Sequence, residues 1–478
     1  MGNVQNEKGE IMKSMKRMFQ NGFLVLALGS LVSCSQGGFL GEVQTTTQGY
    51  QNGAEDGGDS LYQEGPVDIP VTIAKMSVDS TQIETKTVEE ALYLIGGAGA
   101  VEGGKEVVVS NVAKPENTLV VAVEENGSFE ADVTELASGD DVFSVGIKDG
   151  EEVMVPAYVA VNKNGVSTSL LTFSEKINMM GVFGINEPEG TLTYSEEDES
   201  GFELKKVFLH GGEMSGLDLS SYAEKVHQLI YSRDGSFAVY TDENFNLHQY
   251  DLPTSTDKTL DEAPVINRHF VLCSDQTTVF EMDQDASGYG SLVKVDLTGE
   301  KEPSVIMADK DRMMQGASCH LGKLVFVSEK EGNFEVGLME YTTDKNPTLI
   351  YSTKNKVEAP FMMPDGSGYV FSEDTKEEGK KIRLQKFGVD PIIDITVGFE
   401  DSYPVVTEDG KWVIHERSVD QHIQIGATSI LAGKTVVLTS GLNHLRPVLS
   451  TDENLLLMLT ETSQGLQIGI MNLDSVIK

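Results

Sequence analysis

The stretch FMMPDGSGYVF, residues 361–371, carries the pattern that decides the fold. An apolar run enters a polar turn at Asp365 and Gly366, and a second apolar run leaves it. Because Asp and Gly favour tight turns and the flanking residues favour strands, the stretch predicts two antiparallel strands joined by a short loop. The same pattern returns at residues 230–240, 405–414 and 449–457, and in weaker form around residues 189, 275 and 321.

These patterns are evenly spaced along the chain. Taking positions 189, 234, 275, 321, 365, 409 and 452 as equivalent gives spacings of 45, 41, 46, 44, 44 and 43 residues. A period of about 44 residues, with a polar hairpin and a third apolar run after each pair, is typical of a β-propeller with four strands per blade. The chain is therefore predicted to be all-β, with a seven-bladed β-propeller over residues 163–478. A six-bladed ring, with the repeat at residue 189 packed outside it, is the alternative.

The repeats resemble the TolB-like (WD-like) propeller repeat, whose core reads S-P-D-G before an apolar strand. Met363-Pro364-Asp365-Gly366 is the strongest match, and the copies near residues 275 and 321 are the weakest. In that family the Asp-Gly turn joins the two inner strands and is structural. The resemblance implies a propeller and assigns no chemistry to the turn residues.

Closure of the ring is predicted from a strand that stands apart from the repeats. Residues 167–173, STSLLTF, precede the first repeat and have no hairpin partner, while the last repeat supplies three candidate strands. We therefore expect residues 167–173 to form the outer strand of the last blade.

The charge balance excludes one class of partner. The 478 residues include 36 Lys+Arg and 75 Asp+Glu, a formal net charge of −39. Nucleic-acid binding needs a basic surface, which so acidic a chain does not provide. A polytopic membrane protein is excluded as well, because no apolar run reaches the roughly 20 residues needed to span a bilayer.

Residues 1–33 are predicted to be an export signal. A basic segment precedes the apolar run GFLVLALGSL at residues 22–31, which is too short to span a bilayer. Residues 31–34, LVSC, resemble a bacterial lipobox, in which the Cys receives lipid. The resemblance implies that Cys34 is the lipidated mature N-terminus, and Ser35 after it points to the outer membrane. Met12 or Met15 as the start would give a more usual signal length.

Two further segments separate this anchor from the repeats. Residues 34–66 are rich in Gly, Gln and Thr without an apolar period, which predicts a disordered tether. Residues 67–162 contain seven short β-rich runs between turns, which predict a β-sandwich. The segments around Gly97-Ala98-Gly99, Asn126-Gly127 and Gly139-Asp140 resemble bacterial Ig-like modules, which usually serve as spacers or stalks.

A candidate binding face follows from aligning the repeats. In a four-stranded blade, the loop before the first strand and the hairpin between strands two and three lie on one side of the ring. Polar and basic residues begin the first strands, and acidic residues occupy the hairpins. The inner set is His227, Gln228, Arg268, His269, Gln315, Glu358, Tyr403 and Arg446, and the acidic set includes Glu196, Glu197, Asp198, Glu373 and Asp374. Such a face suits a cationic segment of a partner or divalent cations, but hairpin tips are also acidic simply because they are solvated.

Metal and thiol chemistry are only weakly indicated. Asp283 and Asp285 half resemble a calcium loop, but Lys294 stands where the closing Glu belongs. Cys273 and Cys319 occupy equivalent places in neighbouring repeats, which are usually too far apart for a bridge. We expect two buried free thiols, although export would permit a disulfide.

No catalytic motif is found. The sequence contains neither G-x-S-x-G nor H-E-x-x-H, so we expect no enzyme activity and no cofactor beyond the lipid on Cys34. The expected protein is a monomeric lipoprotein of the cell envelope, attached to the outer membrane, whose propeller binds envelope proteins. A ligand- or ion-binding protein, or an enzyme, that works in the propeller channel is the alternative.

Overall fold

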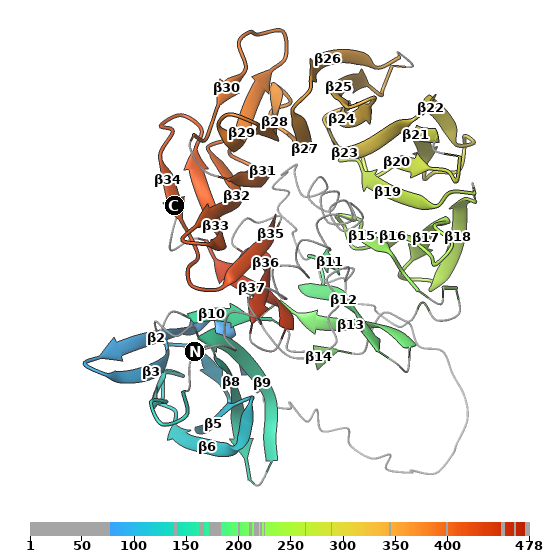
Figure 1. The fold of residues 1–478 in the computed structure, drawn as a ribbon. Helices are drawn as coiled ribbons and strands as arrows, with labels where there is room; N and C mark the ends of the chain where they lie inside the picture. The colour runs from blue at the N-terminus through green and yellow to red at the C-terminus, as the bar shows by residue number, and fades with distance from the viewer. Residues whose placement is uncertain are drawn as a thin grey trace, which may run out of the picture.

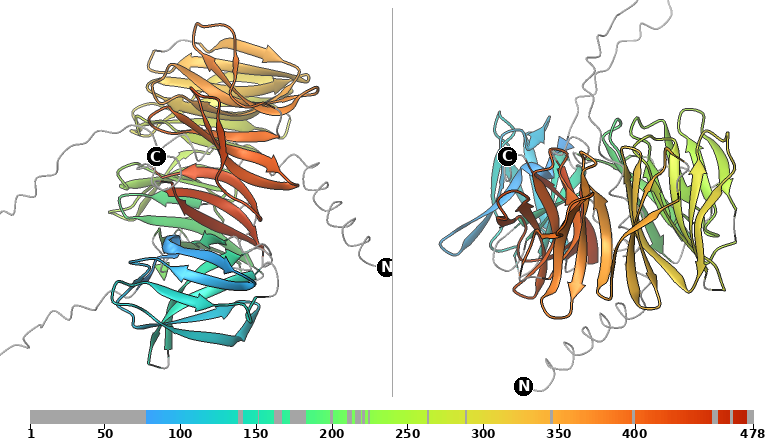
Figure 2. Two further views of the ribbon diagram at one scale, coloured as in Figure 1. Left: turned by 90° about the vertical axis from the view of Figure 1, so that its left-hand side faces the viewer. Right: turned by 90° about the horizontal axis from the view of Figure 1, so that it is seen from above.

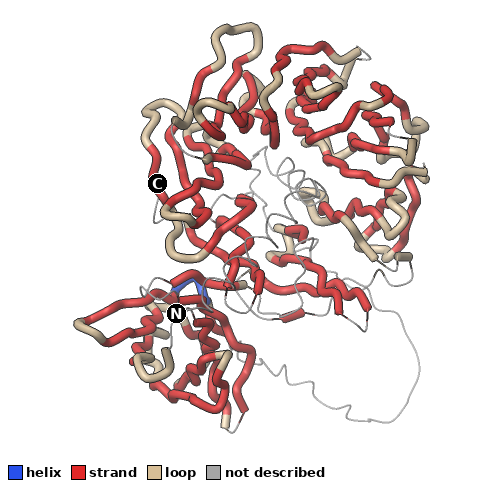
Figure 3. The backbone as a smooth tube through the Cα atoms, viewed as in Figure 1, coloured by secondary structure: helices blue, strands red, loops and turns tan. Residues whose placement is uncertain are grey.

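The computed structural model describes residues 77–473, except 138–140, 151, 162–166, 172–182, 199–200, 210–212, 215–218, 220–221, 224, 263, 288, 344–345, 398–399, 451–454 and 463–464. The predicted signal, Cys34, the tether and the candidate strand at residues 67–76 lie outside this part. Within it nearly all regular structure is β, apart from the short 3₁₀ turn η2 (Ser80–Gln82) (Figure 3). Among the described residues, no helix has the length and apolar character that crossing a membrane requires.

Most of the chain forms a ring of antiparallel sheets arranged around a central axis (Figure 1). Each sheet pairs its strands in chain order, with the first strand nearest the centre of the ring and the last at its outer edge. The inner strands carry runs of consecutive buried residues, so both of their faces are buried, and each sheet must therefore be covered by its two neighbours. Six sheets are β11–β14 (Phe183–Asn186, Thr191–Asp198, Gly201–Phe208, Glu213–Met214), β15–β18 (Gln228–Tyr231, Phe237–Thr241, Leu247–Asp251, Thr256–Asp261), β19–β22 (Asn267–Leu272, Thr278–Gln284, Tyr289–Asp296, Ser304–Lys310), β23–β26 (Arg312–His320, Lys323–Lys330, Asn333–Glu340, Thr348–Thr353), β27–β30 (Lys356–Met362, Gly368–Thr375, Gly379–Lys386, Ile393–Asp394) and β31–β34 (Asp401–Val406, Trp412–Val419, His422–Ser429, Thr435–Val437).

The remaining sheet of the ring joins the two ends of the domain. It contains β35 (Asn443–Leu449), β36 (Leu455–Thr462), β37 (Gly465–Asn472) and, from far earlier in the chain, β10 (Ser167–Leu170). Ser169 pairs with Ile470, and Leu170 pairs with Gly469. The prediction that residues near 167–173 supply the outer strand is confirmed. Among the described strands, six sheets of the ring have four strands each, and β35, β36, β37 and β10 belong to a sheet of eight; the number of blades stays a prediction.

The repeat at residue 189 lies inside the ring. Its strands β11 and β12 belong to the first sheet, which packs against both neighbours. Leu192 and Tyr194 of β12 share a hydrophobic cluster with Val448 of β35 and Leu457 of β36. These contacts favour a place for the repeat within the ring, and the six-bladed alternative stays untested.

The N-terminal unit is a β-sandwich. One sheet is β2-β3-β7, and the facing strands run in the order β6-β5-β8-β9; the short pair β1-β4 lies beside them. Leu94, Val109, Phe143 and Val159 are fully buried in the core that the two sheets share. The bounds are Ser77–Val78 for β1, Ile83–Val88 for β2, Ala91–Gly96 for β3, Val101–Glu102 for β4, Glu106–Asn111 for β5, Lys114–Ala122 for β6, Phe129–Asp132 for β7, Asp141–Asp149 for β8 and Glu152–Val161 for β9.

The sandwich and the ring share one sheet. Strand β10 pairs with β37 on one side and with β9 on the other, so eight strands run without a break from β35 to β6. Figure 2 shows the blue and teal sandwich beside the red strands of the chain end. The sandwich is therefore hydrogen-bonded to the ring, unlike a spacer on a flexible linker.

A disulfide links two neighbouring sheets of the ring. Cys273 follows β19, Cys319 lies in β23, and both are fully buried with their Cα atoms 5.1 Å apart. The expectation of free thiols is wrong, because the first strands of these two sheets approach each other closely enough for a bridge. At these two cysteines the inner strands of neighbouring sheets lie closer together than the average spacing of blades implies.

Removing this bridge should weaken the ring. The bond closes a loop with a sequence separation of 46, and replacing both cysteines by alanine frees that loop in the unfolded chain. We expect the free energy of unfolding to fall by about 3 kcal/mol. Urea unfolding of the Cys273→Ala/Cys319→Ala variant measures this, with Cys34→Ala as the control. An unchanged midpoint, or a wild type indifferent to reductant, would contradict the prediction.

Candidate functional site

Four consecutive first strands are interrupted by a β-bulge at equivalent places. The pairing register shifts between Met314 and Gly316, and at the corresponding positions of β27, β31 and β35. In the last three, a residue with positive φ precedes a proline, in the pairs Ala359-Pro360, Tyr403-Pro404 and Arg446-Pro447. Proline suits a bulge because it has no N–H for the ladder. The bulges leave Gln315, Ala359, Tyr403 and Arg446 partly exposed beside buried neighbours, in the strands nearest the centre of the ring.

Three residues of the predicted inner set meet at these bulges. The guanidinium of Arg446 lies 3.4 Å from the centroid of the Tyr403 ring, a cation–π contact between neighbouring sheets. Burial would raise the pKa of Glu358, but Lys380 and Lys356, together with Arg446, hold it below its ordinary value. Burial raises the pKa of Tyr403, so its hydroxyl stays protonated. These three residues lie in first strands, as the repeat alignment placed them, and their role in binding stays a prediction.

The carboxylate of Glu416 fixes the position of the Arg446 backbone. The Oε1 atom of Glu416 accepts a hydrogen bond from the Arg446 backbone N–H at 2.8 Å, and its Oε2 atom accepts one from Ser402 at 3.0 Å. Glu416 lies in β32, one strand outward from the first strand β31. It was not predicted, because the repeat alignment considered only the starts of first strands.

Other residues of the inner set have structural roles. The Gln228 side chain donates to the Phe270 carbonyl at 2.8 Å and accepts from the Phe270 N–H at 3.1 Å, which ties β15 to β19. His227 stacks on Phe245 with ring centroids 4.4 Å apart, and burial lowers its pKa. Burial likewise lowers the pKa of His269 to about 4, so both imidazoles are neutral at pH 7.

Arg268 is buried between its own sheet and the neighbouring β15–β18 sheet, which corrects its predicted place on an open face. It is 1% exposed and binds three carboxylates. Its Nε is 2.9 Å from Asp283, its Nη2 is 2.9 Å from Asp261, and its Nη1 is 3.2 Å from Glu281. Successive side chains of a strand point to opposite faces of the sheet. A residue next to Arg268 in the sequence therefore points in the opposite direction.

The predicted acidic set divides between buried and exposed side chains. Glu373 is fully buried and accepts hydrogen bonds from Tyr351 at 3.1 Å and Asn355 at 2.7 Å, with Arg383 2.5 Å away. Its place on a solvated hairpin is a wrong prediction, since it lies within β28. Asp374 is half-buried at the end of that strand. Glu196, Glu197 and Asp198 lie in β12, and their side chains are outside the described set.

Exposed acids nevertheless line the hairpins. The connections between second and third strands carry Glu331, Glu377, Glu378 and Asp420 as exposed residues in three consecutive sheets. Because every sheet has the same strand order, these hairpin tips lie on the side of the ring where the first strands begin. We call these four residues the acidic rim.

The proposed calcium pair is not brought together. Asp285 closes its own hairpin, since its Oδ1 accepts from the N–H groups of Ser287 at 2.8 Å and Tyr289 at 2.9 Å. Asp283 instead joins Asp261 and Glu281, whose oxygens come within 4.8 Å of one another. The guanidinium of Arg268 already binds this triad and supplies its positive charge, so the triad does not fit a metal ion without displacing that side chain.

Glu281 makes the triad sensitive to pH. Burial raises its pKa well above the ordinary value, although Arg268 opposes the shift. A carboxyl group whose pKa is higher in the folded than in the unfolded protein contributes to stability in full at pH values below its unfolded-state pKa. That contribution is lost as the pH rises through its folded-state pKa. We therefore expect Glu281→Gln to stabilise the protein by about 1 kcal/mol at pH 7.5. The gain should disappear near pH 4 in urea unfolding; a loss of stability at pH 7.5 would refute this account.

Comparison with known proteins supports the ring architecture. No family model matches the sequence, and no curated protein matches it either. Among solved structures, an oligogalacturonate lyase from Vibrio parahaemolyticus superimposes with a TM-score of 0.54 at 15% identity, covering 71% of this chain and 100% of that one. The ring is a β-propeller. Puromycin hydrolase matches with a TM-score of 0.51 at 10% identity, covering 64% of this chain and 55% of that one.

The comparisons establish the propeller fold and nothing finer. A putative TolB from Agrobacterium tumefaciens also matches, at 14% identity and a TM-score of 0.37, covering 51% of this chain and 88% of that one. At that distance the TolB-like character of the repeats stays a prediction. At such identities a shared propeller carries no shared chemistry, since one fold hosts many functions.

Proposed function

We propose that this protein is a cell-envelope lipoprotein whose propeller binds a partner protein across the mouth of its channel. The observation that carries the proposal is the placement of the acidic rim on the side of the ring where the bulged first strands expose Tyr403 and Arg446. An interface commonly combines aromatic and Arg side chains at its centre with a polar rim. The acids of the rim favour a basic segment of the partner.

The surface formed by Glu358, Tyr403 and Arg446 is suited to recognition because these side chains are held in place. Arg446 is stacked on Tyr403 and bonded through its backbone to Glu416, and Glu358 is bound by Lys356 and Lys380. Side chains that are ordered before binding lose little entropy when a partner docks. No catalytic set of nucleophile and base is apparent among the described residues of this surface, which favours binding over catalysis.

The location rests on two independent features. The resemblance of residues 31–34 to a lipobox supports lipidation at Cys34, followed by the tether. The bridge between Cys273 and Cys319 supports an oxidising compartment, where disulfides persist. The proposal places the protein in the envelope, anchored to the outer membrane by the lipid.

The test is capture of partners from cross-linked envelopes. The rim variant Glu331→Gln/Glu377→Gln/Asp420→Asn removes three exposed negative charges around the channel mouth. The control variant Glu300→Gln/Glu302→Gln/Glu408→Gln removes three exposed charges on the opposite side. We expect one partner to be captured by wild type and control and lost with the rim variant.

Each other outcome counts against the proposal. A partner retained by the rim variant but lost with the control would move the interface to the opposite side of the ring. A partner retained by both would assign binding to the sandwich. Failure of wild type to capture any protein would favour the alternative, a small ligand in the channel.

A further inference from the structure

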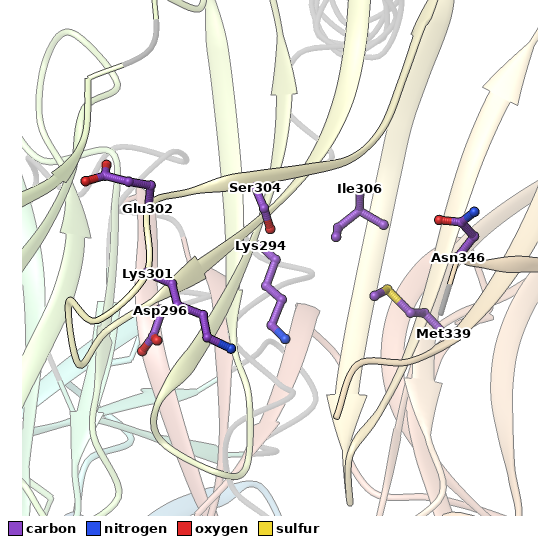
Figure 4. Close-up of a pocket in the computed structure, with 8 residues that line it drawn as sticks. All are labelled: Lys294, Asp296, Lys301, Glu302, Ser304, Ile306, Met339 and Asn346. Atoms are coloured by element: carbon purple, nitrogen blue, oxygen red, sulfur yellow. The ribbon is translucent and has the colours of Figure 1, made fainter. Parts of the chain in front are cut away.

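A cavity outside the channel lies between the third and fourth of the six sheets set out above. It has a volume of about 380 Å³, within the range of small-ligand sites. Strands β21 and β22 form one side, and β25 with the loop after it forms the other (Figure 4). It opens at the end of the ring opposite the acidic rim, because the loops between third and fourth strands lie there. The proposed channel function does not use it.

The floor of the cavity is apolar. Met339 is only 4% exposed and packs in the cluster that fills the space between these two sheets, with Ile306 against it. The thioether and the branched side chain give a surface that an aliphatic group can cover. A ligand that touches this floor therefore needs an apolar portion of a few carbons.

Two ammonium groups stand beside this floor. The Nζ of Lys294 donates to the Tyr341 carbonyl of the neighbouring sheet at 2.8 Å, which holds it in place. An ammonium group has three donors, so this bond leaves two for a ligand. Lys301 projects to the same region, as Figure 4 shows.

Two carboxylates line the cavity, and Figure 4 shows Glu302 pointing away from the lysines and Asp296 beside them. Asp296 is oriented by Thr298, whose N–H and hydroxyl donate to its Oδ1 at 2.9 and 2.7 Å. These hydrogen bonds first, and then Lys301 and Lys294, keep the pKa of Asp296 below its ordinary value. The cavity thus presents charges of both signs near an apolar surface.

We propose that this cavity binds a small zwitterion with an apolar side chain, of the class of the apolar α-amino acids. The two lysines would receive the carboxylate, Asp296 the ammonium group, and Met339 with Ile306 the side chain. A simple organic anion fits less well, because Asp296 and the overall charge of −39 oppose it. A simple amine fits less well because it offers no anion to the two donors of Lys294 that the Tyr341 carbonyl leaves over.

Three probes of one shape test the charge requirement. L-Leucine carries both charges, 4-methylpentanoate lacks the ammonium group, and 3-methylbutylamine lacks the carboxylate. Saturation-transfer NMR titration of the full protein gives a Kd for each. We expect leucine to bind about tenfold more tightly than either analogue, the effect of one charge-assisted hydrogen bond. Equal binding of all three, or no saturable binding of leucine, would overturn the proposal.

Substitutions assign the contacts. Lys301→Gln should weaken leucine binding about tenfold and leave it no better than 3-methylbutylamine. Asp296→Asn keeps an oxygen for Thr298 and should erase the preference over 4-methylpentanoate. Lys310→Gln and Glu300→Gln remove exposed charges that do not line the cavity and should change nothing. Unaltered leucine binding in Lys301→Gln and Asp296→Asn would also overturn the proposal.

Discussion

Replacing Ser169 by proline should destabilise the propeller and its junction with the sandwich. Ser169 lies in β10 and pairs with Ile470 on one side and Val159 on the other, so it holds the closure of the ring and the junction with the sandwich. Proline has no N–H for the ladder and its ring crowds the adjacent strand. We expect the free energy of unfolding to fall by about 4 kcal/mol or more.

The single tryptophan makes this measurement specific. Trp412 lies in β32, in the sheet next to the one that contains β35, β36, β37 and β10, and the chain contains no other Trp. Urea unfolding followed by its fluorescence therefore reports on the propeller and not on the sandwich. The control is Thr348→Pro, at the exposed start of the outer strand β26, which should cost far less. If the urea midpoint of Ser169→Pro equals that of Thr348→Pro, β10 does not close the ring.

Arg268→Met should have the next largest effect. The methionine keeps much of the side-chain volume but leaves Asp261, Glu281 and Asp283 without their shared cation. Removing one partner from a buried ionic cluster typically costs about 3–5 kcal/mol. Arg233→Met, at an exposed turn, is the matched control and should stay within about 0.5 kcal/mol of wild type.

The pH dependence separates this electrostatic cause from a packing defect. In Arg268→Met the carboxylates repel one another most when all are ionised, so the destabilisation should be largest near pH 8 and smaller near pH 4. Adding Glu281→Gln should restore part of the lost stability at pH 8. A defect of equal size at both pH values would indicate packing instead.

The sequence carried more information on the fold than on the site. A turn that recurs about every 44 residues reflects a physical requirement, since each blade must present the same apolar faces to its neighbours. The missing strand at residues 167–173 could be deduced for the same reason, because an open ring leaves an unpaired edge. The number and order of the strands are enough for these two predictions.

The site depends on details that the repeat alignment did not resolve. Glu373 and Arg268 were placed on the binding face because they lie near a hairpin or at the start of a strand, and a shift of one residue reverses the direction of a side chain. The bulges were detectable, since Pro360, Pro404 and Pro447 follow one another at spacings of 44 and 43 residues. The bridge between Cys273 and Cys319 needed the actual distance between two inner strands.

The closure of the ring by β10 also sets the order of assembly. The sandwich and β10 leave the ribosome long before β37, so an incomplete chain carries β10 with one edge waiting for a partner. During synthesis and export, the β37 segment of a neighbouring molecule can fill that edge as well as the chain's own, which is the geometry of domain exchange. We expect crowded production to yield strand-exchanged dimers, and slow production at low concentration to yield monomers.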